Sequence, residues 1–190
     1  SPEEVGLGSR EPVADVARVL SGYVDCIVAR VLSHDHLVEM AENATVPVIN
    51  GLSDLEHPCQ AISDMVTISE HQGELPGLKL AFVGDGNNVA RSLCLGLPAV
   101  GMTFAIATPP GYQLDQATLE LARERANGNG AVVQAVTDPQ DAVLGADVVY
   151  TDVWASMGQE EEAAERFRSF QGYTVDPALL ALAREHDVDL

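Results

Sequence analysis

The sequence predicts an α/β protein with two doubly wound, Rossmann-like domains built on parallel sheets, the first of them incomplete. Short apolar runs alternate with segments of helical periodicity along the chain. The length of 190 residues suits one domain and part of another, or two small domains, and a hydrophobic content of 46% is enough for a core. Leu75-Pro76-Gly77 interrupts the pattern, so we expect one domain at 1–74 and a second at 75–190.

In the first part, we expect helices where an early proline or a capping residue precedes apolar residues at helical spacing. We expect strands where a short apolar run stands alone. The expected elements are a helix opened by Glu11-Pro12-Val13, a strand at about 24–31, a helix capped by Ser33, a strand at 46–49, a loop at 50–54 and a helix at 58–72. Gly73 is expected to end the last helix.

The second part alternates more regularly, which predicts right-handed βαβ units around a parallel sheet. Strands are expected at 78–83, 103–108, 131–136 and 147–151, and helices at 87–100, 115–126 and 159–170, with a short helix after Asp138-Pro139 and a last one from Asp176-Pro177. Asp115 and Asp138 stand where a carboxylate caps a helix N-terminus.

Net charge excludes two classes of partner. The chain carries 29 acidic and 10 basic residues, a net charge of −19, which repels nucleic acid and anionic membrane surfaces. There is neither an apolar run of transmembrane length nor a signal-peptide pattern, so we expect a cytoplasmic protein. Three widely spaced cysteines predict neither a disulfide framework nor a zinc ribbon, and we expect them to be reduced.

The same charge predicts a response to salt. Lys79 is the only lysine, and this bias fits either adaptation to high salt or a GC-rich genome. If the charge reflects adaptation, self-repulsion should destabilise the fold in dilute buffer, and salt should relieve it as the Debye length falls to about 3 Å at 1 M. We expect the melting temperature to rise between dilute buffer and molar salt. An unchanged value would leave genome composition as the explanation.

The segment 152–162 follows an apolar run that reads as a buried strand. It places the carboxylate of Asp152 and the hydroxyl of Ser156 beyond the strand's carboxyl end, where open α/β sheets bind ligands. Two further polar clusters are expected in comparable positions: His57-Pro58-Cys59-Gln60 and Gly84-Asp85-Gly86-Asn87-Asn88. These three clusters are the candidate site.

A dinucleotide site is the main competing interpretation of the glycine-rich turn. Strand, Gly84-x-Gly86 and helix occur in the right order, but the third glycine is replaced by Val89 and no acid closes the next strand. The amides at the start of the following helix, beside Asn87 and Asn88, suit a carboxylate better than a pyrophosphate. Helix capping is the simpler explanation for one of the two asparagines.

Arg30, His57 and Gln60 form the second candidate group. Arg30 ends an apolar segment that could be a central strand, and a guanidinium there can bind a phosphate in a fork. Taken singly, each could instead be an ordinary surface or helix-start residue. His34 and His36 lack the usual spacing of metal ligands, so we expect no metal site. Cys59 has no nucleophile signature and is expected to be a small core or helix residue.

The chain resembles the ornithine carbamoyltransferases from its first helix to its last strand. The resemblance rests on Ala17-Arg18-Val19-Leu20-Ser21, Asn50-Gly51-Leu52-Ser53-Asp54, His57-Pro58-Cys59-Gln60, Gly84-Asp85-Gly86-Asn87-Asn88 and Ser156-Met157-Gly158. His-Pro-x-Gln is common to transcarbamoylases, whereas Ser-Met-Gly after Asp-x-Trp distinguishes the ornithine enzymes from their aspartate and putrescine relatives.

The resemblance implies roles for individual residues. Arg30, His57 and Gln60 would bind carbamoyl phosphate, with Arg30 and His57 stabilising the developing oxyanion. Ornithine would be bound at its α-carboxylate by Asn88 and the Met157 amide, and at its α-amine by Asp152 and Ser156. Arg30, His57 and Asp152 are the expected catalytic residues. No cofactor is implied, and a homotrimer or a multiple of it is the expected assembly.

Family members are longer than this chain. They carry a Ser-x-Arg-Thr phosphate loop upstream of Ser1 and a His-Cys-Leu-Pro motif beyond Leu190. The sequence is therefore interpreted as a portion of a whole enzyme, or else as a shortened, non-catalytic relative that binds an amino acid. A different transcarbamoylase is the remaining alternative. A polypeptide of only these 190 residues is expected to form no citrulline.

Overall fold

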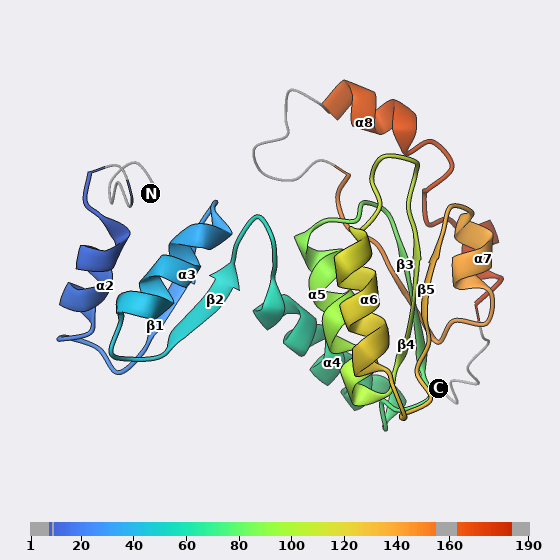
Figure 1. Ribbon diagram of the computed structural model, residues 1–190. Coiled ribbons are helices and arrows are strands. Elements are labelled where there is room, and N and C mark those ends of the chain that lie inside the picture. Colours follow the sequence, from blue (N-terminus) through green and yellow to red (C-terminus); the bar gives the residue numbers. More distant parts are fainter. Residues whose placement is uncertain (1–7, 9, 155–162, 184–190) are drawn as a thin grey trace. The chain divides into compact units, whose positions relative to one another are not determined.

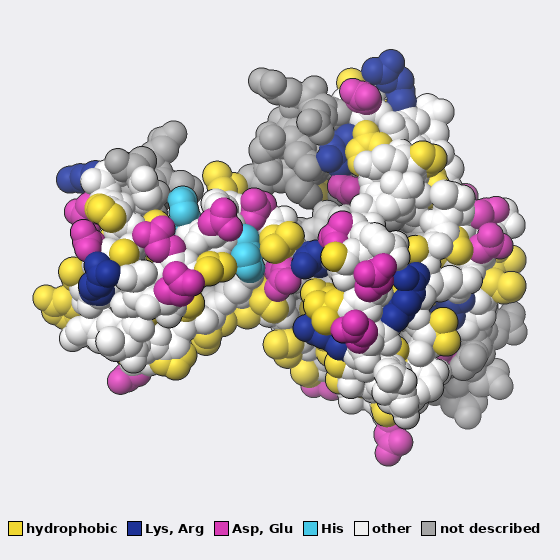
Figure 2. Space-filling view, in the orientation of Figure 1, with side chains coloured by type: hydrophobic (Ala, Val, Ile, Leu, Met, Phe, Trp, Pro, Cys, Tyr) yellow, Lys and Arg dark blue, Asp and Glu magenta, His cyan; other side chains and the backbone are white. Residues whose placement is uncertain are grey.

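The computed structural model describes residues 8, 10–154 and 163–183. The chain divides into two compact units, Ser1–Gln60 and Ala61–Leu190, and each is described by itself. The four-stranded sheet of the second unit is shown with its helices in Figure 1. Acidic side chains are spread over the visible face instead of gathering in one patch (Figure 2).

The first unit contains a parallel strand pair with two helices. Its elements are α2 (Val13–Leu20), β1 (Ile27–Arg30), α3 (His34–Asn43) and β2 (Val48–Leu52). Val13, Ala17, Ile27 and Met40 form its buried cluster, so the helices cover one side of the strands. A register shift between Ala29 and Arg30 aligns Arg30 with Leu52, and both strands end at the same edge.

Three expectations for the first unit need correction. The strand expected at 24–31 is shorter, because the chain turns at 21–23 and first pairs when the Ile27 amide bonds to the Pro47 carbonyl at 2.9 Å. The strand expected at 46–49 instead begins at Val48 and runs through Asn50 and Gly51, which had been assigned to a loop. Gly51 fits there because an added Cβ would lie 3.2 Å from the Ala29 carbonyl oxygen.

Ser33 occupies the N-cap position of α3, but its side chain makes no capping hydrogen bond. The amide of His34 bonds instead to the Asp54 carboxylate at 2.9 Å. A carboxylate from a neighbouring loop therefore satisfies one of the amides at the helix start that have no partner within the helix.

The second unit is a doubly wound sheet with the strand order β5-β4-β3-β6. Its strands are β3 (Lys79–Val83), β4 (Thr103–Ala107), β5 (Val133–Val136) and β6 (Val148–Tyr150), all paired in parallel. Its helical segments are α4 (Pro58–Gln72), which begins in the first unit, α5 (Asn88–Gly96), η1 (Pro98–Val100), α6 (Gln116–Arg125), α7 (Pro139–Val143), α8 (Ala163–Ser169) and α9 (Pro177–Leu180).

Alternation along the central strands creates two hydrophobic layers. In β3, Leu80 and Phe82 pack with α4, α5 and α6, whereas Ala81 and Val83 face α7 and the aromatic residues beyond α8. Strand β4 repeats the pattern, and Figure 1 shows α5 and α6 on one side of the sheet and α7 on the other. Burial of both faces explains why these strands read as continuous apolar runs.

Helix boundaries follow local signals closely. Helix α4 has the predicted bounds and ends before Gly73, whose φ is +84°. Asp115 and Asp138 cap α6 and α7 as predicted. The helix expected at 87–100 is wrong in its last turn: α5 ends at Gly96 and a short 3-10 helix follows, because Pro98 has no amide to donate to an α-helical bond.

Candidate active site

The carboxyl ends of β3 and β6 lie side by side at the point where the strand order reverses. From β3 the chain moves outward to β4 and β5, then returns to place β6 on the other side of β3. Open α/β sheets bind ligands at such a reversal. The Thr151 hydroxyl donates to the Val83 carbonyl at 2.8 Å and joins the two chain segments as they leave the sheet.

Asn87 connects the two predicted clusters. Its side-chain oxygen accepts hydrogen bonds from the amides of Val89 and Ala90, at 3.1 and 3.0 Å, and so caps α5. Its Nδ2 donates to Oδ2 of Asp152 at 2.9 Å. Sequence reasoning assigned capping to one asparagine but missed this contact. The only local signal was the capping position itself, because Asp152 lies 65 residues away.

Asn88 and Asp152 supply complementary groups at this edge. Asn88 is the first residue of α5, and its Oδ1 accepts from the Val89 amide at 3.0 Å. Oδ1 of Asp152 accepts from the Val153 amide at 2.7 Å, and both side chains are half-buried. A fixed carboxylate next to a helix N-terminus can bind the ammonium and the carboxylate of an α-amino acid.

Gly86 allows the turn to pass close to the chain before α6. Its amide donates to the Tyr112 carbonyl at 2.9 Å. A Cβ on Gly86 would lie 2.6 Å from the Leu114 nitrogen, 2.7 Å from the Tyr112 oxygen and 2.8 Å from the Gln113 carbonyl carbon. The second glycine of the Gly-x-Gly pattern is thus explained by backbone packing.

Two titratable groups near Asp152 have shifted pKa values. Burial raises the pKa of Asp85, the bond and charge of Arg166 oppose that shift, and the charge of Asp152 adds to it. Burial also raises the pKa of Tyr150 above its ordinary value, and the charge of Asp64, together with its hydrogen bond to the phenol, acts in the same direction. The Tyr150 phenol therefore remains neutral, and Asp64 ties α4 to the end of β6.

The candidate phosphate-binding residues belong to the first unit. Arg30 is the exposed last residue of β1, His57 is half-buried in the loop before α4, and Gln60 lies in the first turn of α4. Because Arg30 pairs with Leu52, and His57 follows that strand by five residues, Arg30 lies at the carboxyl edge of the strand pair and His57 lies beyond it.

Ser53 organises the loop that leads to His57. It is fully buried, and its Oγ accepts from the Glu56 amide at 3.1 Å and lies 2.9 Å from Nδ1 of His34. The Asp54 amide donates to the Leu32 carbonyl at 3.0 Å. The loops after β1 and β2, which follow Arg30 and precede His57, are therefore held against each other.

Ser156 and Met157 lie outside the described residues. Among the residues that are described, no group of His, Cys, Asp and Glu could hold a metal ion.

Cys59 is exposed in the first turn of α4, with Sγ bonded to the Asn50 carbonyl at 3.3 Å, so it is a helix residue and not a core residue. Burial raises the pKa of the Cys94 thiol to about 12. No helix in the described ranges is long and apolar enough to cross a membrane.

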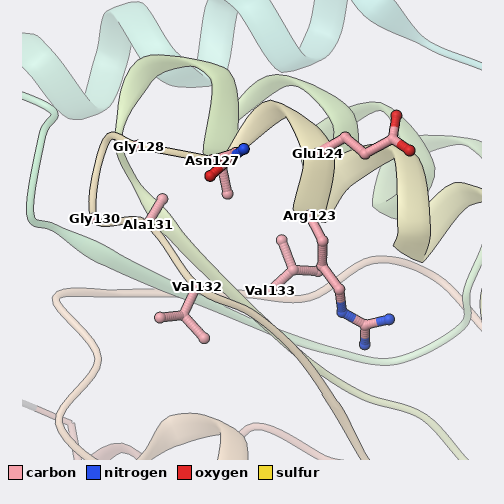
Figure 3. A pocket seen from close by; sticks show the side chains of 9 residues that line it. Arg123, Glu124, Asn127, Gly128, Gly130, Ala131, Val132 and Val133 are labelled. Atoms are coloured by element: carbon pink, nitrogen blue, oxygen red, sulfur yellow. The ribbon is translucent and has the colours of Figure 1, made fainter.

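An open hollow of about 710 Å³ lies between the end of α6 and the start of β5 (Figure 3). Its lining includes Arg123, Asn127 and Val132. These residues precede β5, whereas the candidate site follows the carboxyl ends of β3 and β6. The hollow therefore lies at the opposite edge of the sheet from the candidate site.

The family models and the curated relatives that match this chain belong to the same family. Residues 76–189 match the model of the aspartate/ornithine carbamoyltransferase Asp/Orn binding domain, and residues 1–70 match that of the carbamoyl-P binding domain. The curated ornithine carbamoyltransferases of Anoxybacillus flavithermus and Carboxydothermus hydrogenoformans are 50% and 53% identical, over 97% and 94% of this chain. The chain spans only 59% and 58% of their lengths.

A solved structure shows the same fold. The ornithine carbamoyltransferase of Pyrococcus furiosus is 49% identical to this chain and matches it with a TM-score of 0.88. The match covers 92% of this chain and 56% of that one.

Proposed function

This chain belongs to the aspartate/ornithine carbamoyltransferase family, and from that premise we propose that the protein transfers the carbamoyl group of carbamoyl phosphate to the δ-amine of L-ornithine. The products are citrulline and phosphate. The observation that carries the assignment of an α-amino-acid acceptor is the Asp152 carboxylate, joined to Asn87 at the junction of β3 and β6. It offers a negative charge to an α-ammonium group beside the N-terminus of α5.

The charges around Asp152 favour ornithine over aspartate. Arg166 is 2.6 Å from Asp85, the carboxyl on which the charge of Asp152 acts, so this guanidinium is already paired with an acid. Aspartate would bring a second, side-chain carboxylate into this acidic region. The side chain of ornithine ends in an amine instead, so it adds no negative charge near Asp152.

The remaining contacts follow from the resemblance. Asn88 and the Met157 amide would bind the α-carboxylate of ornithine, and Ser156 would assist Asp152 at the α-amine. The domain at 75–190 would hold ornithine, and the domain at 1–74 carbamoyl phosphate. Holding the two substrates next to each other in this way supplies much of the rate enhancement, because it brings the two reacting groups together.

The chemistry is electrostatic. The neutral δ-amine donates its lone pair to the carbonyl carbon, the carbon–oxygen bond to phosphate breaks, and the nitrogen loses a proton. Arg30 and His57 would stabilise the negative charge on the carbonyl oxygen and the leaving phosphate, while Gln60 would hold the carbamoyl amide. The two substrates supply both the nucleophile and the leaving group, so the reaction needs no cofactor.

The wider assignment is part of the same proposal. We expect a cytoplasmic homotrimer, or a multiple of it, acting in arginine biosynthesis or breakdown, with an acidic surface adapted to salt. Sedimentation of the full-length protein in dilute buffer and in molar salt would measure the assembly in both conditions. A monomer that turns over ornithine would contradict the trimer without affecting the proposed reaction.

The reaction is tested with the full-length protein and three acceptors: L-ornithine, L-aspartate and putrescine. We expect citrulline from ornithine, with kcat/KM on the order of a hundredfold or more above that for either competitor. Calorimetry with ornithine in the absence and presence of carbamoyl phosphate is the companion measurement. Preferred carbamoylation of aspartate, or tight ornithine binding without any turnover, would contradict the proposal.

A further inference from the structure

A buried ion pair lies close enough to Asp152 for the charge of Asp152 to act on it. Arg166 on α8 donates to Oδ2 of Asp85 at 2.6 Å, and the two side chains are only 9% and 10% exposed. Asp85 belongs to the turn after β3 that also carries Asn87. The pair therefore connects α8 to the turn that holds Asp152 in place.

Arg166 makes two further contacts that fix its direction. The same nitrogen, Nη1, donates to the Trp154 carbonyl at 3.0 Å, and the guanidinium lies over the Tyr112 ring, 5.0 Å from its centroid. Phe170 packs on both rings, stacked on Trp154 at 5.6 Å and edge-on to Tyr112 at 4.9 Å. The chain leaving Asp152 and the turn after β3 thus bind one guanidinium.

Stability alone is a weak explanation for this arrangement. Removing two charges from water costs several kcal/mol per ion, and well-packed apolar residues often replace such a pair without loss. A buried pair does fix geometry, because either partner left alone would be an uncompensated buried charge. The desolvation cost of the Arg166–Asp85 pair is therefore consistent with a role in fixing the geometry around Asp152.

Charge balance gives Arg166 a second effect. The charge of Asp152 is close enough to Asp85 to disfavour the ionised form of that carboxyl. Without Arg166, two carboxylates would repel each other across the turn. With Arg166 in place, the three groups leave one net negative charge, which suits a single ammonium.

We infer that Arg166 is a positioning residue for the amino-acid half of the site. It acts through Asp85 and the Trp154 carbonyl to hold Asp152 and Asn87 in the geometry that accepts an α-amino group. It need not touch either substrate. The inference rests on the proposed function and adds a residue to the proposed ornithine contacts.

The experiment uses the full-length protein with Arg166→Met, Arg166→Lys and the double variant Arg166→Met with Asp85→Asn. Arg166→Met should raise KM for ornithine about ten- to a hundredfold, because the carboxylate is misplaced, while KM for carbamoyl phosphate changes little. Arg166→Lys keeps the charge and should recover most of the loss. The double variant leaves no buried uncompensated charge and should fall between the two single Arg166 variants.

A second measurement separates positioning from simple destabilisation. Leu179→Ala removes a buried side chain of α9 from the same hydrophobic layer and should lower the melting temperature without changing KM for ornithine. L-norvaline, which keeps the α-groups of ornithine but lacks the reacting amine, reports binding directly. Its dissociation constant should rise in Arg166→Met and remain unchanged in Leu179→Ala.

The pH dependence of stability gives an independent readout. Without Arg166, burial would raise the pKa of Asp85 further, so the stability of Arg166→Met should fall as pH rises from about 4 through that raised pKa. The double variant should lack this fall. If wild type forms citrulline and Arg166→Met behaves like Leu179→Ala, the inference is wrong. If wild type neither forms citrulline nor binds L-norvaline, the proposed function itself fails.

Discussion

Replacing Asp152 by asparagine in the full-length protein is expected to lower kcat/KM for ornithine on the order of a hundredfold or more. Asparagine keeps the size of the side chain and an oxygen that can accept from Nδ2 of Asn87, the bond that spans 2.9 Å in the present structure. The substitution therefore removes the charge, and the second acceptor oxygen that binds the Val153 amide, with little change in shape. The loss should appear as weaker use of ornithine, with KM for carbamoyl phosphate nearly unchanged.

Asp138→Asn is the matched control for Asp152. Asp138 follows β5, so it lies at the same edge of the parallel sheet, and it is exposed. Its carboxylate caps α7 by accepting from the Gln140 amide at 2.9 Å, a role that asparagine fills equally well. This variant removes the same charge from the same edge and should keep wild-type kinetics.

The kinetic pattern separates local from general charge effects. A loss in Asp152→Asn alone assigns the effect to the contact with the α-amine. An equal loss in both variants would mean that the field of the acidic surface governs ornithine binding. Unaltered ornithine kinetics in Asp152→Asn would remove this carboxylate from the site.

Sequence signals predicted the elements whose ends are determined locally. The bounds of α4 were predicted because Pro58 starts the helix and Gly73 ends it. The extension of β2 through Asn50 and Gly51 was missed, since turn-like composition is overridden there by pairing with β1. Such pairing depends on residues far away in the chain, which a local pattern does not contain.

The candidate site divides in the same way. The strand-end position of Asp152 followed from the apolar run before it, and the motifs after β2 and β3 supplied the other candidates. Arg166 could not be found by this route, because its partner Asp85 is 81 residues away and no motif surrounds it. Residues that act through a partner become visible only when the fold brings them together.

Gly86→Ala is expected to disturb both the fold and the site. The added methyl carbon would meet backbone atoms of Tyr112, Gln113 and Leu114 at 2.6 to 2.8 Å, and backbone has no rotamer by which to move away. Overpacking of this kind costs about 3 kcal/mol. For a chain of this size that lowers the melting temperature by about 6–12 °C.

The Gly86→Ala substitution should also weaken ornithine binding. It would displace Tyr112, whose ring lies beneath the guanidinium of Arg166. We therefore expect Gly86→Ala to raise KM for ornithine in the protein that remains folded. Gly128→Ala is the control: its φ of +85° strains any side chain, but nothing lies within 4 Å of the added carbon. That variant should lose about 1–2 kcal/mol to backbone strain and keep its KM. Equal KM values in the two variants would show that the close approach of Gly86 to Tyr112 does not hold the site.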